Sequence, residues 1–428
     1  MSSAGAMAHT IHVIGLGVEK GARLSRDAEQ ALATSHSVIG STRQLALAAR
    51  LLAAESLDVK YCQALPKLAE LKAMIEALPA GDITILASGD PLYFGIGRWL
   101  GTQFDPQQIR FYPSISSIQA VCNHLGLAQQ DCVVASFHGR DLRGLQRILK
   151  RNKTLIILTD QHSHPRALAS ACVDAGFEQS HLWVCEQLGT DKEQYRRFEV
   201  TELSNDESFS CDPLQVSMIE VRGAGGVLPE FPGIDDFSFA SDRGPGRGMF
   251  TKRETRLAVL SLIQPASGDV IWDIGAGCGG VATELAYWND AVQVYAIEQH
   301  PERLDCLREN QHRFGTAVNL NIVDGRAPEA LQGLPAANKV FIGGNDGELD
   351  SILQTVWQQL PDGGLLVASA VTADSERQLH AFAKAHAADH TEVVQIAISK
   401  GSLQEDRVAF KAKMPVTLFK LIKNGVSN

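Results

Sequence analysis

The chain has 428 residues, about twice to three times the usual domain length, and its 45% hydrophobic and 21% charged residues are typical of a globular protein. A net charge of −10 argues against a general nucleic-acid binder, because neutralising phosphates requires a basic surface. No apolar run approaches the ~20 residues that span a bilayer, the start "MSSAGAMAHT" lacks signal-peptide features, and the eight cysteines lack metal-binding spacing, so we expect a cytoplasmic protein without a membrane segment or metal site.

Strand-like and helix-like segments alternate through the first half of the chain. Short buried strands are predicted at 9–15, 36–40, 82–88, 131–136 and 153–159. Amphipathic helices are predicted between them at 26–34, 67–78 and 164–176. This alternation predicts an α/β fold with mostly parallel sheets.

The stretch 222–248 interrupts the alternation, because it is rich in Gly, Pro and Asp and has no periodicity. We therefore predict domains at 1–222 and 249–428, joined by a linker at 223–248. In the second domain we expect a helix at 251–263 and strands at 269–274, 292–297, 320–323, 338–342 and 364–370. Two final strand-like runs, 391–399 and 415–423, have no helix between them and predict an antiparallel hairpin at one sheet edge.

The segment "DIGAGCGG" at 273–280 predicts a strand, a tight turn and a helix. Gly275, Gly277 and Gly279 allow the backbone to approach a ligand without a Cβ clash. The segment fits both the dinucleotide pattern G-x-G-x-x-G and the methyl-donor pattern D/E-x-G-x-G-x-G, and Glu298 suits a ribose hydroxyl in either case. A purely structural role in helix–strand packing is a third interpretation.

Three features favour S-adenosylmethionine (SAM) over NAD as the ligand of this loop. Asp273 stands two places before the first glycine and suits an ammonium group. The expected C-terminal hairpin is typical of methyltransferase sheets. In "DGRAPEAL", the residues Gly325, Arg326 and Ala327 follow the third strand and are placed to face an adenine ring.

The segment "GMFTKRETR" at 248–256 precedes this domain's first helix. Thr251 and Glu254 have the spacing of a capping box. Arg243, Arg247, Lys252, Arg253 and Arg256 form a basic cluster in sequence. An anionic partner and a solvated linker face explain the cluster equally well.

Four loops of the first half carry polar residues or glycines after a predicted strand. They contain Gly15 and Gly17, then Ser88 to Gly97, then Ser114, Ser116 and Ser117, and finally His138 and Arg140. Each serine taken singly is best explained as a helix N-cap, and a lone histidine is more often packed or exposed than catalytic. Four such loops at the carboxyl ends of strands together indicate a ligand site.

The first ~220 residues resemble the tetrapyrrole (corrin and porphyrin) methylases through "HVIGLGVE", "LSRDAEQAL", "SGDPLYFGIG", "SISSIQ" and "SFHGRDL", in that order, especially those that methylate C-5 of the corrin precursor. From about residue 232 the chain resembles cobalamin-pathway methyltransferases that methylate C-15 and decarboxylate the C-12 acetate arm, through "PGIDDFSFASDRG", "GMFTKRE", "WDIGAGCGG", "DGRAPEAL" and "FIGGNDGEL". The resemblance implies a tetrapyrrole-methylase fold followed by a Rossmann-like class I SAM methyltransferase with an antiparallel C-terminal hairpin.

The resemblance also implies two SAM sites and a ring-binding surface. The first SAM site would comprise Gly15, Leu16, Gly17, Gly89, Asp90, Tyr93, Phe94, Gly95 and Ser116. The second would comprise Thr251, Asp273, Gly275, Ala276, Gly277, Cys278, Gly279, Glu298, Gly325, Arg326 and Ala327. Residues placed to contact the ring would be His138, Arg140, Arg243, Arg247, Lys252, Gly343 and Gly344. No catalytic residue is assigned, because a sulfonium methyl is already activated.

The implied function is a bifunctional SAM-dependent C-methyltransferase of cobalamin biosynthesis, acting as a homo-oligomer on a small-molecule tetrapyrrole. The alternatives are an RNA or protein methyltransferase with an N-terminal recognition domain, a SAM-binding sensor and an NAD-dependent dehydrogenase. Three positions depart from the family pattern: "VEKGARLS" replaces a Gly/Pro-rich run, Cys278 stands at a position where Thr or Ser is frequent, and Asn345-Asp346 replace an expected Ser-Gly.

Overall fold

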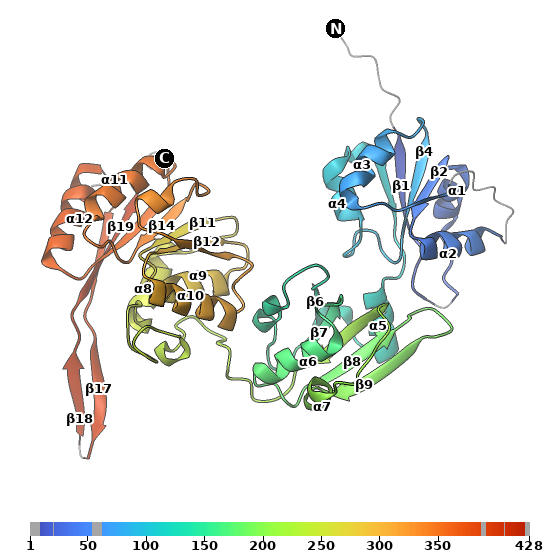
Figure 1. Ribbon diagram of the computed structural model, residues 1–428. Coiled ribbons are helices and arrows are strands. Elements are labelled where there is room, and N and C mark those ends of the chain that lie inside the picture. Colours follow the sequence, from blue (N-terminus) through green and yellow to red (C-terminus); the bar gives the residue numbers. More distant parts are fainter. Residues whose placement is uncertain (1–8, 20, 54–61, 387–390, 406, 424–428) are drawn as a thin grey trace, which may run out of the picture. The chain divides into compact units, whose positions relative to one another are not determined.

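The computed structural model describes residues 9–19, 21–53, 62–386, 391–405 and 407–423. The chain divides into two compact units. The N-terminal unit comprises 1–142 and 151–225, and the C-terminal unit comprises 143–150 and 226–428. Both contain sheets covered by helices (Figure 1).

The first sheet of the N-terminal unit is fully parallel, with strand order β3-β2-β4-β1-β5. Its strands are β1 (Thr10–Gly15), β2 (Ser37–Gly40), β3 (Cys62–Ala64), β4 (Asp82–Ala87) and β5 (Ile109–Tyr112). Its helices are α1 (Arg26–Thr34), α2 (Thr42–Ala53), α3 (Leu68–Glu76) and α4 (Gly97–Gln103). The apolar runs of β1 and β4 are buried on both faces, as is usual for a parallel sheet.

The second sheet of this unit is mostly antiparallel, so the expectation of parallel sheets is wrong here. The strand order is β6-β7-β10-β8-β9, and only β6 and β7 run parallel. A short connection joins β8 to β9, which suits antiparallel neighbours. The elements are α5 (Ser117–Leu125), β6 (Cys132–Ser136), β7 (Thr154–Leu158), α6 (Pro165–Asp174), β8 (His181–Glu186), β9 (Gln194–Glu199), α7 (Val200–Asn205) and β10 (Gln215–Glu220).

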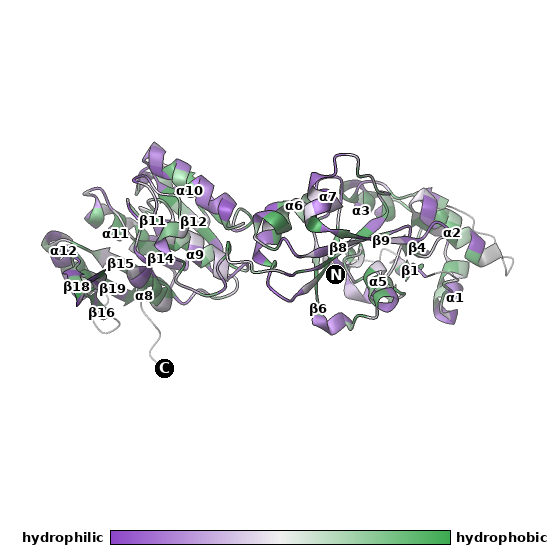
Figure 2. Ribbon diagram, turned by 90° about the horizontal axis from the view of Figure 1, so that it is seen from below, coloured by the Kyte–Doolittle hydropathy of each residue, from purple (hydrophilic) through white to green (hydrophobic). Residues whose placement is uncertain are grey.

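The C-terminal unit contains a seven-stranded sheet of order β13-β12-β11-β14-β15-β19-β16. Its strands are β11 (Val270–Ile274), β12 (Gln293–Glu298), β13 (Leu320–Asp324), β14 (Lys339–Ile342), β15 (Leu365–Ala370), β16 (Thr391–Ile396) and β19 (Val416–Ile422). Its helices are α8 (Arg253–Ile263), α9 (Gly280–Trp288), α10 (Pro301–Arg313), α11 (Leu349–Gln359) and α12 (Ala373–His386). The chain order reverses between β11 and β14, where open α/β sheets bind ligands. In Figure 2, α10 carries both hydrophilic and hydrophobic residues, as expected for a helix that covers a sheet.

The predicted antiparallel tail is confirmed, with one addition. β19 pairs antiparallel with both β15 and β16, so β19 lies inside the sheet and β16 forms its edge. Between them the chain forms a separate hairpin of β17 (Ser399–Gln404) and β18 (Arg407–Ala412), which we call the β17–β18 arm. Figure 1 shows this arm extending beyond the rest of its unit.

The stretch 223–248 has the composition of a linker, yet from Gly233 onward it packs within the C-terminal unit. Ile234 and Phe239 are buried in one hydrophobic cluster with Phe250. The fully buried Arg256 forms ion pairs with Asp236 at 3.0 Å and Glu284 at 2.6 Å. Since burying a guanidinium is unfavourable unless it is paired, this network holds the stretch against α8 and α9.

The start of α8 differs from the predicted capping box. The N-cap is Lys252, and its side chain makes no capping hydrogen bond. Instead, Asp236 Oδ1 accepts a hydrogen bond from the Arg253 backbone N–H at 3.0 Å. The free N–H of the first turn is therefore satisfied from a distant loop and not by Thr251.

The short segment 143–150 also belongs to the C-terminal unit. Arg147 donates from Nη2 to the backbone oxygens of Ala286 and Tyr287, at 2.7 and 2.9 Å, near the end of α9. Its Nη1 donates to Asn319 Oδ1 at 3.0 Å. A cation at this position satisfies the last carbonyl groups of the helix and opposes its dipole.

Candidate active sites

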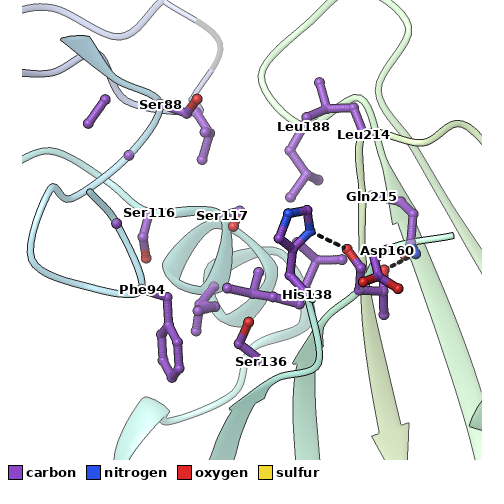
Figure 3. Close-up of a pocket in the computed structure, with 18 of the residues that line it drawn as sticks. Ser88, Phe94, Ser116, Ser117, Ser136, His138, Asp160, Leu188, Leu214 and Gln215 are labelled. Carbon is purple, nitrogen blue, oxygen red and sulfur yellow. Dashed lines mark hydrogen bonds between the residues drawn. The ribbon is translucent and has the colours of Figure 1, made fainter. Parts of the chain in front are cut away.

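A cleft of about 1660 Å³ opens at the carboxyl ends of β1, β4 and β5 in the N-terminal unit. The loops after these strands form one wall, and the loops after β6 and β7 with the start of β10 form the other. Figure 3 shows Ser88 and Ser116 on the first wall, with Leu188, Leu214 and Gln215 across from them. Small-molecule sites usually measure ~300–1,000 Å³, so this cleft has room for a cofactor-sized ligand and a second molecule.

Most of the residues assigned to the first SAM site and its neighbourhood meet in this cleft. The predicted residues that line it are Gly89, Asp90, Tyr93, Phe94, Gly95, Ser116, His138 and Arg140. The others, Gly15, Leu16 and Gly17, lie behind it, and the Leu16 side chain is fully buried in the core. The glycine turn therefore contributes to the wall and not to the lining.

Close packing explains the two glycines of that turn. A Cβ atom on Gly15 would lie 2.2 Å from the carbonyl oxygen of Gly89. Gly17 has φ +76°, and its Cβ would lie 2.7 Å from Ser114 Oγ. The turn can thus press against the two loops that line the cleft only without side chains.

Ser116 caps α5, as expected for a serine at this position. Its Oγ accepts a hydrogen bond from the Gln119 backbone N–H at 3.2 Å, and Gln119 Oε1 accepts one from the Ser116 N–H at 2.9 Å. This complete capping box fixes the loop between β5 and α5. The same serine lines the cleft, so its structural role and its location at a ligand site coincide.

The loop after β4 presents an aromatic pair to the cleft. Asp90 Oδ1 accepts a hydrogen bond from the Leu92 N–H at 2.8 Å and stabilises the turn. Phe94 adopts φ +54°, which is uncommon for a bulky residue and is found mostly where function requires it. Its ring contacts Tyr93 edge-on, with centroids 5.2 Å apart, and Phe94 remains 47% exposed.

Asp160, which directly follows the loop residue Thr159 after β7, was missed by the sequence analysis. Its carboxylate accepts hydrogen bonds from the backbone N–H groups of Gly139, His162 and Ser163 at 2.6, 2.8 and 2.9 Å. These bonds hold the pKa of Asp160 well below its usual range. Through the Gly139 N–H, the ionised group therefore anchors the loop that carries His138. Figure 3 shows His138 and Asp160 near each other in the cleft. The rule applied to the other loops, a polar residue soon after a buried strand, would have found it.

The second candidate site lies at the carboxyl edge of β11, β12, β13 and β14. A small pocket of about 20 Å³ is lined there by six of the predicted residues: Gly275, Glu298, Gly325, Arg326, Ala327 and Gly344. Gln299, Asn345 and Asp346 also line it and were not predicted as site residues. The four loops thus meet at the switch point of the sheet.

The glycine loop after β11 is held by close backbone contacts. Gly275, Gly277 and Gly279 adopt φ of +69°, +61° and +82°. A Cβ on Gly275 would lie 2.4 Å from the Gly344 carbonyl oxygen, and one on Gly277 would lie 2.1 Å from that of Met249. The glycines are therefore required by packing, whichever ligand the loop binds.

Two buried carboxyl groups stand beside this loop. Glu298 accepts hydrogen bonds from the backbone N–H groups of Gly277, Gln299 and His300 at 2.9, 2.8 and 2.9 Å. Neither carboxyl oxygen of Asp273 has a hydrogen-bond partner within the described part of the chain. Burial raises the pKa of Asp273 to about 7. The Ala282 N–H opposes the shift, although it forms no regular hydrogen bond with the carboxyl group, and the charge of Glu298 adds to the shift.

Several predicted residues of the second site lie away from the pocket. Cys278 is fully buried in a hydrophobic cluster, and burial raises the pKa of its thiol to about 12. Lys252 lies over the Phe250 ring at 3.7 Å and donates to the Gly246 oxygen at 3.2 Å, and burial lowers its pKa. The other predicted residues that do not line the pocket are Thr251, Asp273, Ala276, Gly277, Gly279 and Gly343.

The basic cluster of 243–256 does not form one surface. Arg256 is interior, and Arg253 pairs with Asp235 at 3.3 Å. Arg243 and Arg247 are exposed, and neither side chain forms a hydrogen bond or ion pair with another described residue. Only these two arginines of the cluster remain available to an anionic ligand.

Contacts of Asp346 narrow the second pocket. Its carboxylate accepts a hydrogen bond from Gln299 Nε2 and lies 3.8 Å from His300 Nε2. Its backbone oxygen accepts one from Arg326 Nη2 at 3.2 Å. Asp346 adopts φ +43°, a conformation that favours the glycine expected at this position.

Replacing Asp346 by glycine is expected to strengthen SAM binding at the second site by roughly three- to tenfold. The change removes the carboxylate contact across the pocket, which is worth about 1 kcal/mol. Glycine also adopts the positive φ of this position freely, so the backbone there is not strained. Titration calorimetry of D346G and D346N would measure it, with D346N retaining a side chain that can bond to Gln299. Unchanged or weaker binding by D346G would show that Asp346 does not close the pocket.

No helix in the described ranges is both long enough and apolar enough to cross a membrane. Among the same residues, no group of three or more His, Cys, Asp or Glu side chains is arranged to hold a metal ion.

Two protein families match the two halves of the chain. The tetrapyrrole (corrin/porphyrin) methylases match residues 10–204, and the precorrin methyltransferase domain matches residues 244–423. The chain is therefore a methyltransferase that combines a tetrapyrrole-methylase fold with a class I SAM-methyltransferase fold.

Curated relatives refine this class. A precorrin-6Y C(5,15)-methyltransferase (decarboxylating) from Sinorhizobium sp is 35% identical over 408 residues, covering 95% of this chain and 94% of the relative. One from Mycobacterium tuberculosis is 29% identical, covering 87% and 90%. A probable cobalt-precorrin-6B C(15)-methyltransferase (decarboxylating) from Methanothermobacter thermautotrophicus is 30% identical over 178 residues, covering 42% of this chain and 90% of the relative.

The chain belongs to the precorrin-6Y C(5,15)-methyltransferase (decarboxylating) family, whose members act in cobalamin biosynthesis. The resemblance drawn from the motifs is confirmed. The RNA or protein methyltransferase, the SAM sensor and the dehydrogenase are set aside.

Proposed function

We propose that the two units divide the reaction, each with its own SAM site. The N-terminal unit would methylate C-5 of precorrin-6Y. The C-terminal unit would methylate C-15 and decarboxylate the C-12 acetate, giving precorrin-8X. This proposal rests on the presence of two separate pockets at carboxyl edges of parallel strands, one in each unit. The C(15)-methyltransferase relative supports the division, because it matches a stretch about as long as the C-terminal unit alone.

In the N-terminal cleft, the loop after β4 and the start of α5 would hold SAM. Gly89 and Gly95 allow close approach of the backbone, and the exposed Phe94 offers a ring for stacking. His138 and Arg140, on the opposite wall, would contact the tetrapyrrole. The cleft volume of about 1660 Å³ admits the donor and the ring together.

In the C-terminal unit, the donor groups match the parts of SAM. Glu298 would accept hydrogen bonds from ribose hydroxyls, and Gly325 to Ala327 would face the adenine. Asp273 is a buried carboxyl without a partner, which an approaching ammonium group would supply. The pocket of about 20 Å³ must widen to admit the ligand, and the Asp346 contacts are the ones that would break.

SAM supplies an activated methyl group when bound, so the protein's own contribution is alignment and exclusion of water. Such alignment can lower a barrier by up to ~7–11 kcal/mol. Decarboxylation further requires a pocket that removes water from one carboxylate. Among the residues described as lining the two sites, no hydrogen bond joins a serine or cysteine to a histidine or carboxylate, which agrees with this account.

Mass spectrometry of the products tests the division of labour. The complete chain should add two methyl groups and release one carbon dioxide. Gly89→Val should abolish only the C-5 addition, because its Cβ would lie 2.8 Å from Ser116 Cα and close the first site. If this variant instead loses the C-15 addition or the decarboxylation, the assignment of steps to units is wrong.

We also propose that the protein is a homo-oligomer that uses the β17–β18 arm. A two-stranded hairpin is marginally stable alone, yet this one exposes Leu403 at 90% and Phe410 at 71%. A second copy of the arm would cover these apolar side chains. Light scattering of the full chain should give a multiple of the 46.3 kDa mass, and L403D/F410D should shift it toward a single chain. A wild-type monomer would contradict the proposal.

A further inference from the structure

We propose that Arg43, Gln44 and Ser88 form a carboxylate-binding subsite in the N-terminal cleft. The inference rests on the proposed function of that cleft and deepens it by naming residues that recognise an acidic group of its ligands. All three residues line the cleft. From the sequence, Ser88 belonged to one of the four loops that indicate a ligand site, whereas Arg43 and Gln44 were not assigned to any site.

The three side chains meet because β2 and β4 are neighbours in the sheet. Ser88 follows β4, whereas Arg43 and Gln44 lie in the first turn of α2, just after β2. Arg43 Nη2 donates to Ser88 Oγ at 2.9 Å, and Gln44 Nε2 donates to the same oxygen at 3.1 Å. One hydroxyl oxygen thus accepts two hydrogen bonds.

The orientation of the Gln44 amide follows from its second partner. Gln44 Oε1 accepts a hydrogen bond from the Ser41 backbone N–H at 2.8 Å, and the Gln44 N–H donates to Ser41 Oγ at 3.3 Å. This reciprocal pair is a capping box at the start of α2. With its oxygen engaged there, Gln44 turns its NH₂ group, and not its oxygen, toward Ser88.

In the described ranges of the chain, the cluster has unused hydrogen-bond donors and an unpaired positive charge. A serine hydroxyl has two acceptor lone pairs and one O–H donor. Both lone pairs of Ser88 are occupied, and no acceptor for its O–H is present among the residues that the structure describes. Among the described residues, Ser88 is the one to which the Arg43 side chain hydrogen-bonds, and no acidic side chain of these ranges pairs with the guanidinium.

The cluster therefore turns hydrogen-bond donors and a positive charge toward the cleft. The matching ligand group is an anion that accepts several hydrogen bonds, and a carboxylate has this geometry. Two carboxylates belong to the proposed ligands. One is an acetate or propionate arm of the tetrapyrrole, and the other is the methionine carboxylate of SAM.

Kinetics and calorimetry of Arg43→Met and Ser88→Ala in the full chain test the subsite. Arg50→Met is the matched control, because Arg50 is exposed on the same helix and does not line the cleft. If a ring carboxylate binds here, R43M should raise the KM of precorrin-6Y for C-5 methylation by roughly 10- to 100-fold, with kcat within about threefold. S88A should raise KM by roughly three- to tenfold, and Arg43→Lys should recover part of the loss.

The binding constant of SAM distinguishes the two possible sources of the carboxylate. If SAM supplies the group, R43M should weaken SAM binding to the N-terminal unit by the same roughly 10- to 100-fold. Decarboxylated SAM should then bind equally weakly to the wild type and to R43M. Either pattern supports the subsite.

The subsite would be overturned if R43M and S88A have the same KM for precorrin-6Y and the same SAM binding constant as R50M, each within about twofold. That result would leave the proposed function intact, because C-5 methylation by wild type and R50M is measured in the same assay. Conversely, C-5 methylation at the wild-type rate by the Gly89→Val variant would refute the proposed function of the cleft itself.

Discussion

If each unit binds one SAM as proposed, Gly277→Val should reduce SAM binding from two molecules per chain to one and abolish C-15 methylation while C-5 methylation continues. The added side chain has no room, because its Cβ would lie 2.1 Å from the Met249 carbonyl oxygen. The valine must also adopt φ +61°, which L-residues with branched side chains avoid. Together these effects should destabilise the C-terminal unit by about 2–5 kcal/mol.

Gly268→Val separates the effect of the steric clash from the effect of the positive φ. Gly268 also has a positive φ, +88°, but nothing lies within 4 Å of its Cβ position. This variant should lose only about 1–2 kcal/mol and keep both SAM sites. Titration calorimetry gives the stoichiometry and thermal unfolding gives the stability. If G277V still binds two SAM molecules, or binds none, the two units do not hold independent SAM sites.

Asp273→Asn should remove a pH dependence from the stability of the C-terminal unit. In the wild type the pKa is about 7 in the folded chain, because the group is buried, and about 3.9 when unfolded. Between these values the folded state retains a proton that the unfolded chain releases, so the free energy of unfolding falls as pH rises from about 4 to 7. The total loss is about 4 kcal/mol, and it should vanish in D273N.

Asp269→Asn is a control of opposite sign at the start of the same strand. Burial raises the pKa of Asp269, but hydrogen bonds from Lys339, the Ala266 N–H and Asn338 outweigh it and lower the pKa overall. Asp269 thus stabilises the fold at neutral pH, and its contribution is lost as pH falls through the folded pKa. Thermal unfolding of both variants from about pH 2 to 7 distinguishes these slopes, because the Asp269 effect lies below about pH 4 and the Asp273 effect lies between about pH 4 and 7. An undiminished slope in D273N would disprove the assignment.

The same substitution tests the proposed role of Asp273 in binding. An ammonium group that pairs with the carboxylate favours its ionised form, so SAM binding below about pH 7 should release a proton. Calorimetry in buffers of different ionisation enthalpy measures this release. D273N should bind SAM more weakly at the second site and release no proton there. Equal binding by D273N would place the ammonium elsewhere.

Local patterns were sufficient for much of the fold. The five buried strands predicted in the first half and the parallel strands of the second are present, because continuous apolar runs between turns indicate buried strands. β3, β5, β8, β9 and β10 were not predicted. β9 reads "QYRRFE", and its side chains are largely half-buried, which gives a weak signal. The β17–β18 arm was missed for a related reason, because its exposed strands bury almost nothing.

The sequence by itself determined the family, the two glycine loops and their order, because a loop whose backbone packs this closely against its neighbours must carry glycine at fixed positions. The tertiary structure alone decided which side chains face the sites. It placed Leu16 and Cys278 in the core, buried Arg256 between Asp236 and Glu284, and brought Arg43 and Gln44 to Ser88 across neighbouring strands. Contacts between residues far apart in the chain depend on strand order, and strand order leaves no mark in local composition.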